Sequence, residues 1–322
     1  MTDVIGCLLC AGPPQPGHKF CEGCGRYLHQ SSWRSSTAPA GPCRWCGGAE
    51  LSPEGYCESC GRRRSVGQDH LELALPGVWA VTDKGRHKRR NEDAVAIGRS
   101  GDVVLAVVSD GVSTSSRADE AAHASVDAAM AGLLAALAQG EPAPAATVTA
   151  GRAAAVAVAT LAGADTEHAP PSCTYVSAVV TGTELVIGWV GDSRAYWLAD
   201  PPDQPRRLTI DDSLAGQLAA AGLPAGGSPD PRLSALARWL GADAGDTEPQ
   251  VASFRPAGPG RVLLCSDGLS RYLGEPAELA ATAPGDPAGT ARALNQLSLD
   301  RGGVDNIAIV IIPFPPPEEA SP

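Results

Sequence analysis

The chain has 322 residues, of which 43% are hydrophobic and only 4% aromatic, and its formal net charge is −11. This length suits one large domain with an appendage, or two ordinary domains. No run approaches 18 consecutive apolar residues and no secretory signal opens the chain, so we expect a cytoplasmic protein without a membrane span. The acidic surplus lies beyond residue 65 and argues against general nucleic-acid binding.

Eight of the ten cysteines fall within the first 60 residues, in four C-x-x-C pairs. Residues 7–24 and 43–60 share the spacing C-x2-C-x10-C-x2-C, and FCEGCGR and YCESCGR match 36 positions apart. Four thiolates in two close pairs suit one tetrahedral Zn²⁺. We therefore expect a double zinc ribbon in residues 1–65, with two structural Zn²⁺ ions held by Cys7, Cys10, Cys21, Cys24, Cys43, Cys46, Cys57 and Cys60.

Other interpretations of this head stay open. Disulfides are an alternative, which a chain without a secretion signal does not favour. The spacing says little about purpose, so docking, oligomerisation and a nucleic-acid adaptor role all remain, the last because residues 62–64 are three arginines. Residues 66–76 are expected to form a linker, and the proline-rich residues 314–322 a disordered tail.

Residues 77–313 are expected to form an α+β domain, because hairpin-connected strands occur together with helices gathered in blocks. The predicted elements are a strand at 103–111, helices at 117–138 and 148–163, strands at 174–180 and 184–192 around a Gly182-Thr183 hairpin, a strand that opens residues 261–270 and is followed by Asp-Gly, helices at 275–283 and 288–300, and a last buried strand at 306–314.

Four acidic motifs stand out in this domain: RRNEDA (89–94), VSDG (108–111), CSDG (265–268) and GVDNIAIV (303–310). In three of them an Asp lies at the edge of an apolar run. A single Asp in such a place is usually a turn former or a helix cap. Several carboxylates at strand ends instead indicate a hard divalent cation, Mg²⁺ or Mn²⁺.

Five motifs resemble the metal-dependent PP2C (PPM) protein phosphatases, in the order in which that family has them: TDKGRHKRRNEDA (82–94), VVSDG (107–111), WVGDSRAY (189–196), LLCSDGL (263–269) and GGVDNIAIVI (302–311). Residues 213–245 resemble the flap region of the bacterial members and the segment after it. The resemblance implies an α-β-β-α sandwich of two antiparallel sheets.

The resemblance also implies a set of metal ligands. Asp110 would bridge two Mn²⁺ or Mg²⁺ ions, and the Gly111 carbonyl would be a further ligand. Asp267 and Asp305 would ligate the first ion. Two cations that share a water lower its pKa and neutralise charge on a phosphoryl group, so the water attacks without a phosphoenzyme.

Further site residues follow by the same comparison. Glu92 and Asp93 would hold waters on the metals, and Asn306 would support the cluster. Asp192 would lie near a third metal, or would simply form a turn between strands. Lys88 stands where the family has a phosphate-binding Arg, and it supplies charge without a bidentate fork.

Some positions depart from the family pattern. Arg86, Arg89 or Arg90 are alternatives to Lys88 for binding phosphate. The sequence VSTSSRAD after Asp-Gly leaves the general acid unassigned, and His123 nearby falls on a predicted helix. Ala169 stands where the family has an Asp for the third metal.

The expected function is hydrolysis of phosphoserine and phosphothreonine on proteins, opposing a bacterial Ser/Thr kinase. One alternative is a weak or inactive scaffold that binds phosphoproteins, against which the complete carboxylate set argues. Another is a zinc-ribbon adaptor. Cys173 and Cys265 lie in apolar strands and are expected to be buried packing residues rather than nucleophiles.

Overall fold

The computed structural model describes residues 69–163, 169–201, 203–222, 235–245, 247–282 and 285–316, together with residues 6–7 and 33–34. These last two segments form β1 (Gly6–Cys7) and β2 (Trp33–Arg34), which pair antiparallel. The predicted zinc sites otherwise lie outside the described residues, as do residues 66–68 of the predicted linker and residues 317–322 of the predicted tail.

Two antiparallel sheets form the centre of the domain. The first has six strands in the order β11 (Arg206–Arg207), β10 (Arg194–Ala199), β14 (Gly260–Cys265), β15 (Ile307–Phe314), β4 (Val78–Asp83) and β3 (His70–Leu75). The second has five, in the order β13 (Gln250–Phe254), β9 (Leu185–Val190), β8 (Tyr175–Val180), β6 (Val103–Asp110) and β5 (Asp93–Ser100).

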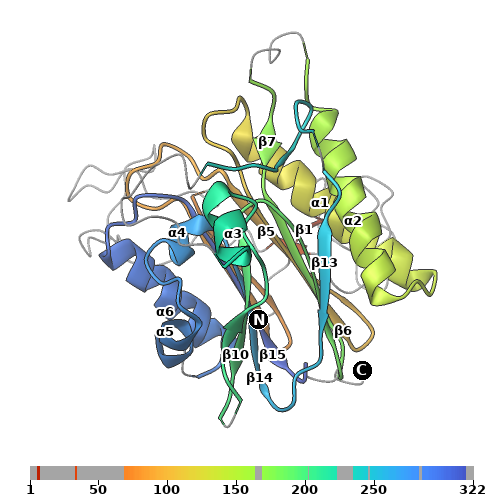
Figure 1. The fold of residues 1–322 in the computed structure, drawn as a ribbon, viewed down its shortest axis with the longest axis vertical. Coiled ribbons are helices and arrows are strands. Elements are labelled where there is room, and N and C mark those ends of the chain that lie inside the picture. The colour runs from red at the N-terminus through yellow and green to blue at the C-terminus, as the bar shows by residue number, and fades with distance from the viewer. Residues whose placement is uncertain are drawn as a thin grey trace.

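Helices cover the outer face of each sheet (Figure 1). The five-stranded sheet packs against α1 (Ala118–Ala138) and α2 (Ala143–Ala159), which bury mostly alanine. The six-stranded sheet packs against α4 (Asp267–Ser270), α5 (Pro276–Thr282) and α6 (Pro287–Asp300). A third apolar core, which includes Trp197, lies between the sheets. This arrangement is the predicted α-β-β-α sandwich.

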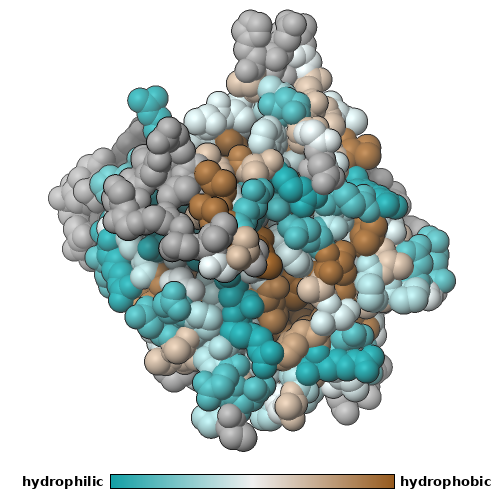
Figure 2. Space-filling model, in the orientation of Figure 1, coloured by the Kyte–Doolittle hydropathy of each residue, from teal (hydrophilic) through white to brown (hydrophobic). Residues whose placement is uncertain are grey.

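The strand patterns explain why the chain forms these layers. Strands β6, β8 and β9 are almost continuously apolar, and nearly every residue in them is buried, as expected for strands covered on both faces. The predicted hairpin between β8 and β9 is present, with the Thr181 amide donating to the Glu184 carbonyl at 2.9 Å. Figure 2 shows apolar side chains beside β13, where Phe254 packs against the core between the sheets.

Two predicted boundaries are wrong, and one short helix was missed. Residues 70–75, expected within a linker, form β3, because HLELAL alternates in the way that suits an edge strand next to β4. The second helix begins at Ala143 rather than 148, with proline in its first turn. The strand expected within 261–270 ends at Cys265, just before Asp-Gly as predicted, but the short helix α4 that begins at Asp267 was not predicted.

Helix α1 is long and apolar enough to cross a membrane by length and composition alone. Core helices of globular domains share that property. Nine of its residues are buried, and it packs on α2 and the five-stranded sheet. Its apolar character is therefore accounted for by the core. The remaining helix, α3 (Leu214–Ala220), lies in the predicted flap region.

Candidate active site

Two carboxylates face each other across neighbouring strands at one end of the five-stranded sheet. Strand β5 begins at Asp93 and β6 ends at Asp110, and the antiparallel register places these two residues directly opposite each other. Like charges in this position repel and destabilise the sheet. Asp93 is 2% exposed. Ser266 Oγ donates to Asp93 Oδ2 at 2.6 Å, while Asp93 Oδ1 is buried with no hydrogen-bond partner.

Three more carboxylates approach this pair from other elements. Asp267 opens α4 directly after β14, and Asp305 precedes β15, the neighbour of β14 in the six-stranded sheet. Asp192 lies in the turn between β9 and β10, which belong to different sheets. The five carboxylates therefore gather where the ends of the two sheets meet.

The crowding shows in the acidities of these groups. Burial, reinforced by Asp267 and Asp305, raises the pKa of Asp93 to about 8. Burial raises the pKa of Asp110 well above its ordinary value, and the neighbouring Asp93 and Asp267 add to the effect. Burial, with smaller contributions from Asp267 and Asp211, raises the pKa of Asp192 to about 7. The site therefore disfavours the ionised carboxylates unless a cation neutralises them.

Glycine at position 111 is required by close packing. A Cβ there would lie 2.5 Å from the Ala118 carbonyl oxygen and 2.8 Å from that of Glu92. The Gly111 amide donates to the Glu92 carbonyl at 3.0 Å. This bond ties the residue after Asp110 to the residue before Asp93.

Asn306 positions the loop of residues 84–92, which carries the predicted site residues Lys88 and Glu92. Its Oδ1 accepts from the Glu92 amide at 2.9 Å, and its Nδ2 donates to the carbonyls of Lys84 and Arg90 at 2.8 and 2.9 Å. Asn306 is buried, so these contacts are protected from water. The side chain thereby joins the end of the loop to the start of β15.

Lys88 lies beside the five carboxylates and contacts one of them directly. Its Nζ is 2.6 Å from Asp305 Oδ1 and 4.0 Å from Glu92 Oε2, and it donates to Ser113 Oγ at 2.6 Å. Ser113 Oγ donates in turn to Glu92 Oε2 at 2.9 Å. Burial lowers the pKa of Lys88, but Asp305, Glu92 and Asp110 together outweigh it, so the pKa is raised and the ammonium stays charged.

The alternative cations and the nearby histidine do not contact Asp305, although Arg90 Nε lies 3.4 Å from Glu92 Oε1. Arg86 Nε donates to the Leu299 carbonyl at 2.7 Å, at the end of α6. Arg90 is exposed and pairs with Asp119 at 3.1 Å. His123 Nδ1 lies 2.7 Å from the Asp119 carbonyl oxygen of its own helix, α1. Among these cations, Lys88 makes the direct contact with Asp305.

Sequence reasoning missed three residues of the site: Ser113, Ser266 and Arg271. Arg271 Nη2 donates to Asp267 Oδ2 at 2.5 Å and to Asp305 Oδ2 at 3.3 Å. A signal for Arg271 existed, because it follows Asp267 by four residues, the spacing of an ion pair on a helix. Ser113 and Ser266 carried no comparable signal, since serines after a strand are common in turns.

The donor chemistry fits divalent metal ions. The five acidic side chains of the site all present oxygen, which Mg²⁺ and Mn²⁺ prefer. Asp93 Oδ1 has no hydrogen-bond partner, and four of the five carboxylates have raised pKa values. Within the ranges that the structure describes, no three acidic, His or Cys side chains are arranged so that they could hold a metal ion. Asp267 and Asp305 instead contact Lys88 and Arg271.

Ala169 has a structural contact at the position where the resemblance implies a third-metal ligand. Its carbonyl accepts from the Ser116 amide at 2.9 Å and from Ser116 Oγ at 2.6 Å. Its methyl side chain offers no oxygen. The residues present therefore do not supply a ligand side chain at this position, whereas Asp192 lies within electrostatic reach of Asp110.

Comparison with known proteins identifies the family. The sequence model described as Protein phosphatase 2C matches residues 83–287, well over half of the chain, and the chain belongs to this family. Serine/threonine protein phosphatase PstP of Mycobacterium tuberculosis is 31% identical over 140 residues, which make up 43% of this chain and 26% of that protein. Serine/threonine phosphatase stp of Listeria innocua is 35% identical over 105 residues, 32% of this chain and 40% of that protein. The chain thus spans less than half of these two relatives.

Solved structures agree with this assignment. The phosphatase MsPP of Mycobacterium smegmatis, in complex with cacodylate, is 27% identical with a TM-score of 0.61, over 74% of this chain and 98% of that one. The catalytic domain of PstP, in complex with two manganese ions, is 26% identical with a TM-score of 0.54, over 73% of this chain and 96% of that one. Stp1 of Staphylococcus aureus, 24% identical over 75% of this chain and 96% of that one, shares the fold with a TM-score of 0.62.

Proposed function

We propose that this chain is a metal-dependent protein-serine/threonine phosphatase. The observation that carries the proposal is the pair formed by the buried Asp93 and Asp110, which are opposed across two strands and surrounded by further carboxylates. A sheet has no structural use for such a pair, because it costs stability unless a cation is bound. Membership of the protein phosphatase 2C family and the names of the relatives support the reaction.

Two Mn²⁺ or Mg²⁺ ions are the proposed cofactors. Asp110, the Gly111 carbonyl, Asp267 and Asp305 are the proposed direct ligands, and Asp192 lies close enough to take part. When bound, such ions supply Lewis-acid activation of water and neutralise phosphoryl charge. The two manganese ions in the structure of the PstP catalytic domain support this number.

The chain's own side chains would orient the reactants. Asn306 fixes the Glu92 amide and so orients Glu92 and the neighbouring Asp93, which would hold water molecules beside the other carboxylates. Lys88 carries a positive charge beside Asp305, where it would bind the phosphoryl oxygens of the substrate. Arg271 supplies a second positive charge at the same carboxylate.

The proposal is tested by hydrolysis of a phosphothreonine peptide by the full chain, with and without Mn²⁺. We expect Mn²⁺-dependent turnover that Asp110→Asn removes. The control is Asp200→Asn, an exposed Asp just beyond the opposite end of β10. If the folded protein binds Mn²⁺ and a phosphopeptide but does not turn it over, the phosphoprotein-binding scaffold replaces the phosphatase. Candidate partners are phosphorylated proteins and, as the source of those phosphates, a Ser/Thr kinase.

We also propose that residues 1–65 hold two Zn²⁺ ions through the eight clustered cysteines. Reduced thiols of this kind fit the expected cytoplasmic location. Zinc analysis of the purified chain is expected to give two equivalents, and Cys43→Ser with Cys57→Ser to remove one. Retention of both ions by that double variant would reject the paired four-cysteine sites. Salt-dependent binding of DNA or RNA by the full chain would favour the adaptor role for this head.

A further inference from the structure

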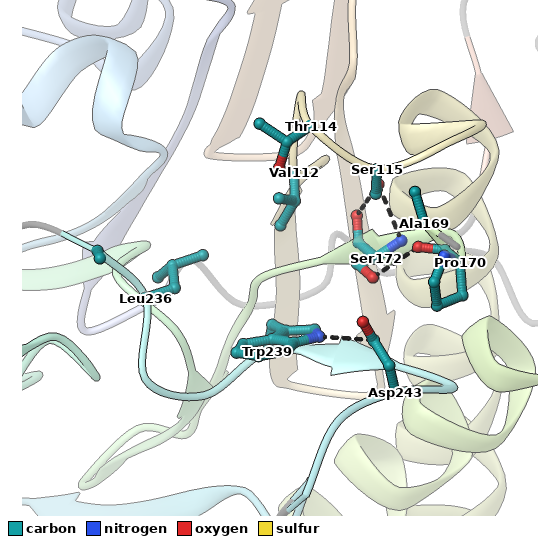
Figure 3. A pocket seen from close by; sticks show the side chains of 10 residues that line it. Val112, Thr114, Ser115, Ala169, Pro170, Ser172, Leu236, Trp239 and Asp243 are labelled. Carbon is teal, nitrogen blue, oxygen red and sulfur yellow. Dashed lines mark hydrogen bonds between the residues drawn. The ribbon is translucent and has the colours of Figure 1, made fainter. Parts of the chain in front are cut away.

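A pocket of about 520 Å³ is lined in part by the segment that directly follows Asp110 and Gly111 (Figure 3). Val112 and Ser115, from the segment that follows Asp110 and Gly111, line one wall with Pro170. Leu236, Trp239 and Asp243, from the segment beyond the flap region, line the facing wall. The proposed phosphatase chemistry does not use this pocket.

Hydrogen bonds hold both walls in place. The Val112 amide donates to the Ser172 carbonyl at 2.9 Å. Strand β7 (Ser172–Cys173) pairs with β12 (Leu240–Gly241), so the two walls share one small sheet. On the far side, the Ala237 amide donates to the Asp212 carbonyl at 2.7 Å. The pocket is therefore a built part of the fold.

The lining combines apolar surface with one charge. Val112, Pro170, Leu236 and the Trp239 indole provide carbon surface, and Asp243 is the one charged residue among the lining side chains that the structure describes. Trp239 Nε1 donates to Asp243 Oδ1 at 3.0 Å, which fixes the carboxylate beside the indole ring. An aromatic face next to a carboxylate suits an ammonium or guanidinium group with an aliphatic stem.

We propose that this pocket binds a Lys or Arg side chain of the phosphoprotein substrate, close in sequence to the phosphorylated residue. The stem would pack on Val112 and Trp239, and the cationic end would meet Asp243. This inference rests on the proposed phosphatase function and adds a substrate class to it: phosphorylated sites flanked by a basic residue.

The spacing of the two sites supports the assignment. Val112 follows Asp110 by two residues, so their Cα atoms are at most about 7.6 Å apart. An extended peptide advances about 3.3 Å per residue. A substrate with its phosphate at the carboxylates would thus bring a residue about two or three positions away to the pocket.

The test uses the full chain with Mn²⁺ and a phosphothreonine peptide in which Lys is moved through about three positions on either side of the phosphorylated residue. At each position Lys is compared with norleucine, which keeps the straight stem without the charge. We expect kcat/KM to favour Lys by roughly three- to tenfold at one position, through KM, and the preference to shrink at high salt. Asp243→Asn, which keeps an acceptor for the indole, should reduce it to about one.

Asp203→Asn is the matched control, because Asp203 Oδ2 also accepts from an indole, that of Trp197, at 3.3 Å. It should leave the Lys preference unchanged. A second variant, Ala235→Trp, should fill the pocket and raise KM for the peptide with Lys at the preferred position, without changing hydrolysis of p-nitrophenyl phosphate, which has no basic side chain.

The outcomes separate the two proposals. If p-nitrophenyl phosphate and all peptides resist hydrolysis, the phosphatase function fails. If they are hydrolysed but no position favours Lys, or if Asp243→Asn leaves such a preference intact, the pocket assignment fails alone. A preference for norleucine over Lys would also overturn it, because the pocket would then take an apolar side chain.

Discussion

Two acidic pairs lie near one another in this protein, and their surroundings differ completely. Asp211 and Asp212 are adjacent in sequence and have ample partners. Asp211 accepts from Arg194 Nε at 3.0 Å and from Nη2 at 2.6 Å. Asp212 accepts from the Gly191 amide at 2.9 Å and from Gln250 Nε2 at 2.8 Å. Asp93 and Asp110 are opposed across strands, and Asp93 Oδ1 has no partner.

The difference teaches how to distinguish a structural carboxylate from one that awaits a cation. Asp211 and Asp212 join β10 and β13 to the segment before α3, so their charges contribute to the fold. For Asp93 and Asp110 the fold supplies burial and like charge, and both raise the pKa. The crowded carboxylates therefore lower the stability of the fold at this site, as is common where a protein binds a ligand or catalyses a reaction.

The largest expected effect is on turnover. Asp110→Asn removes the carboxylate proposed to bridge both ions, and we expect kcat/KM with Mn²⁺ to fall about 10²- to 10⁴-fold, the equivalent of several kcal/mol of transition-state stabilisation. The same substitution should raise the unfolding temperature of the metal-free protein, because one of two opposed like charges is lost. Peptide hydrolysis and thermal unfolding measure the two effects. A variant that lost activity and also unfolded more easily without metal would contradict the comparison.

Removing a partner of the other acidic pair should lower the stability of the protein, where Asp110→Asn is expected to raise it. Arg194→Ala leaves Asp211 without its bidentate partner, and we expect the free energy of unfolding to fall by about 2–4 kcal/mol in urea denaturation. Arg207→Ala is the matched control, since Arg207 lies 3.6 Å from the same carboxylate and is more exposed. It should cost less than about 1 kcal/mol. Equal losses in the two variants would show that the bidentate geometry is unimportant.

The contrast between the pairs also marks how far the sequence reached. Asp110, Asp267 and Asp305 were predictable, because each carboxylate lies beside an apolar strand in a family motif. The opposition of Asp93 and Asp110 was not, because it depends on the register of two strands. The bidentate contact of Arg194 with Asp211 and the pocket beside Trp239 join segments distant in sequence, so no local pattern indicated either.

Local boundaries failed for local reasons. Strand β3 lies at a sheet edge and is short, and its Glu and His side chains resemble those of a linker. Helix α4 has only four residues, too few to show helical periodicity. The layered architecture was easier to predict, because the apolar runs of β6, β14 and β15 and the alanine-rich helices carry strong patterns.

A third prediction concerns pH. The pKa of Asp93 is about 8 in the folded protein, against an ordinary value near 3.8. Between these pH values the folded state keeps a proton that the unfolded state has lost. The free energy of unfolding of the metal-free protein should therefore fall as pH rises from about 4 to 8. Asp93→Asn should be the more stable at pH 8 by more than about 1.4 kcal/mol, the equivalent of one pKa unit. Chemical denaturation at several pH values measures this.

Saturating Mn²⁺ provides the control for that experiment. The bound ions should compensate the charge of Asp93 and flatten the pH dependence in the wild-type protein. Asp102→Asn, at the turn between β5 and β6, changes an exposed Asp in the same hairpin and should leave the slope as it is. An equally steep slope in Asp93→Asn would assign the titration to another group.

The smallest expected effect has the opposite pH dependence. Burial raises the pKa of Glu72 on β3, but His70 and Arg292 outweigh it and lower the pKa to about 2. Its contribution to stability is therefore complete above about pH 4.5 and is lost as pH falls towards 2. Glu72→Gln should lower the free energy of unfolding at pH 7 by about 0.5–1 kcal/mol, a modest value because Arg292 is 57% exposed and solvent screens the pair.

Urea denaturation at pH 7 and pH 3 tests this last prediction, with the exposed Glu275→Gln as its control. The gap between wild type and Glu72→Gln should narrow at pH 3, because Glu72 of the unfolded wild type then binds a proton that the folded state still largely lacks. Arg292 also lies 4.8 Å from the centre of the Trp79 ring, and that contact survives the substitution. A gap of the same size at both pH values would mean that packing of the Glu72 side chain, rather than its charge, joins β3 to α6. Glu72 would then differ from Asp211 and Asp212, whose charges contribute to the fold through their partners.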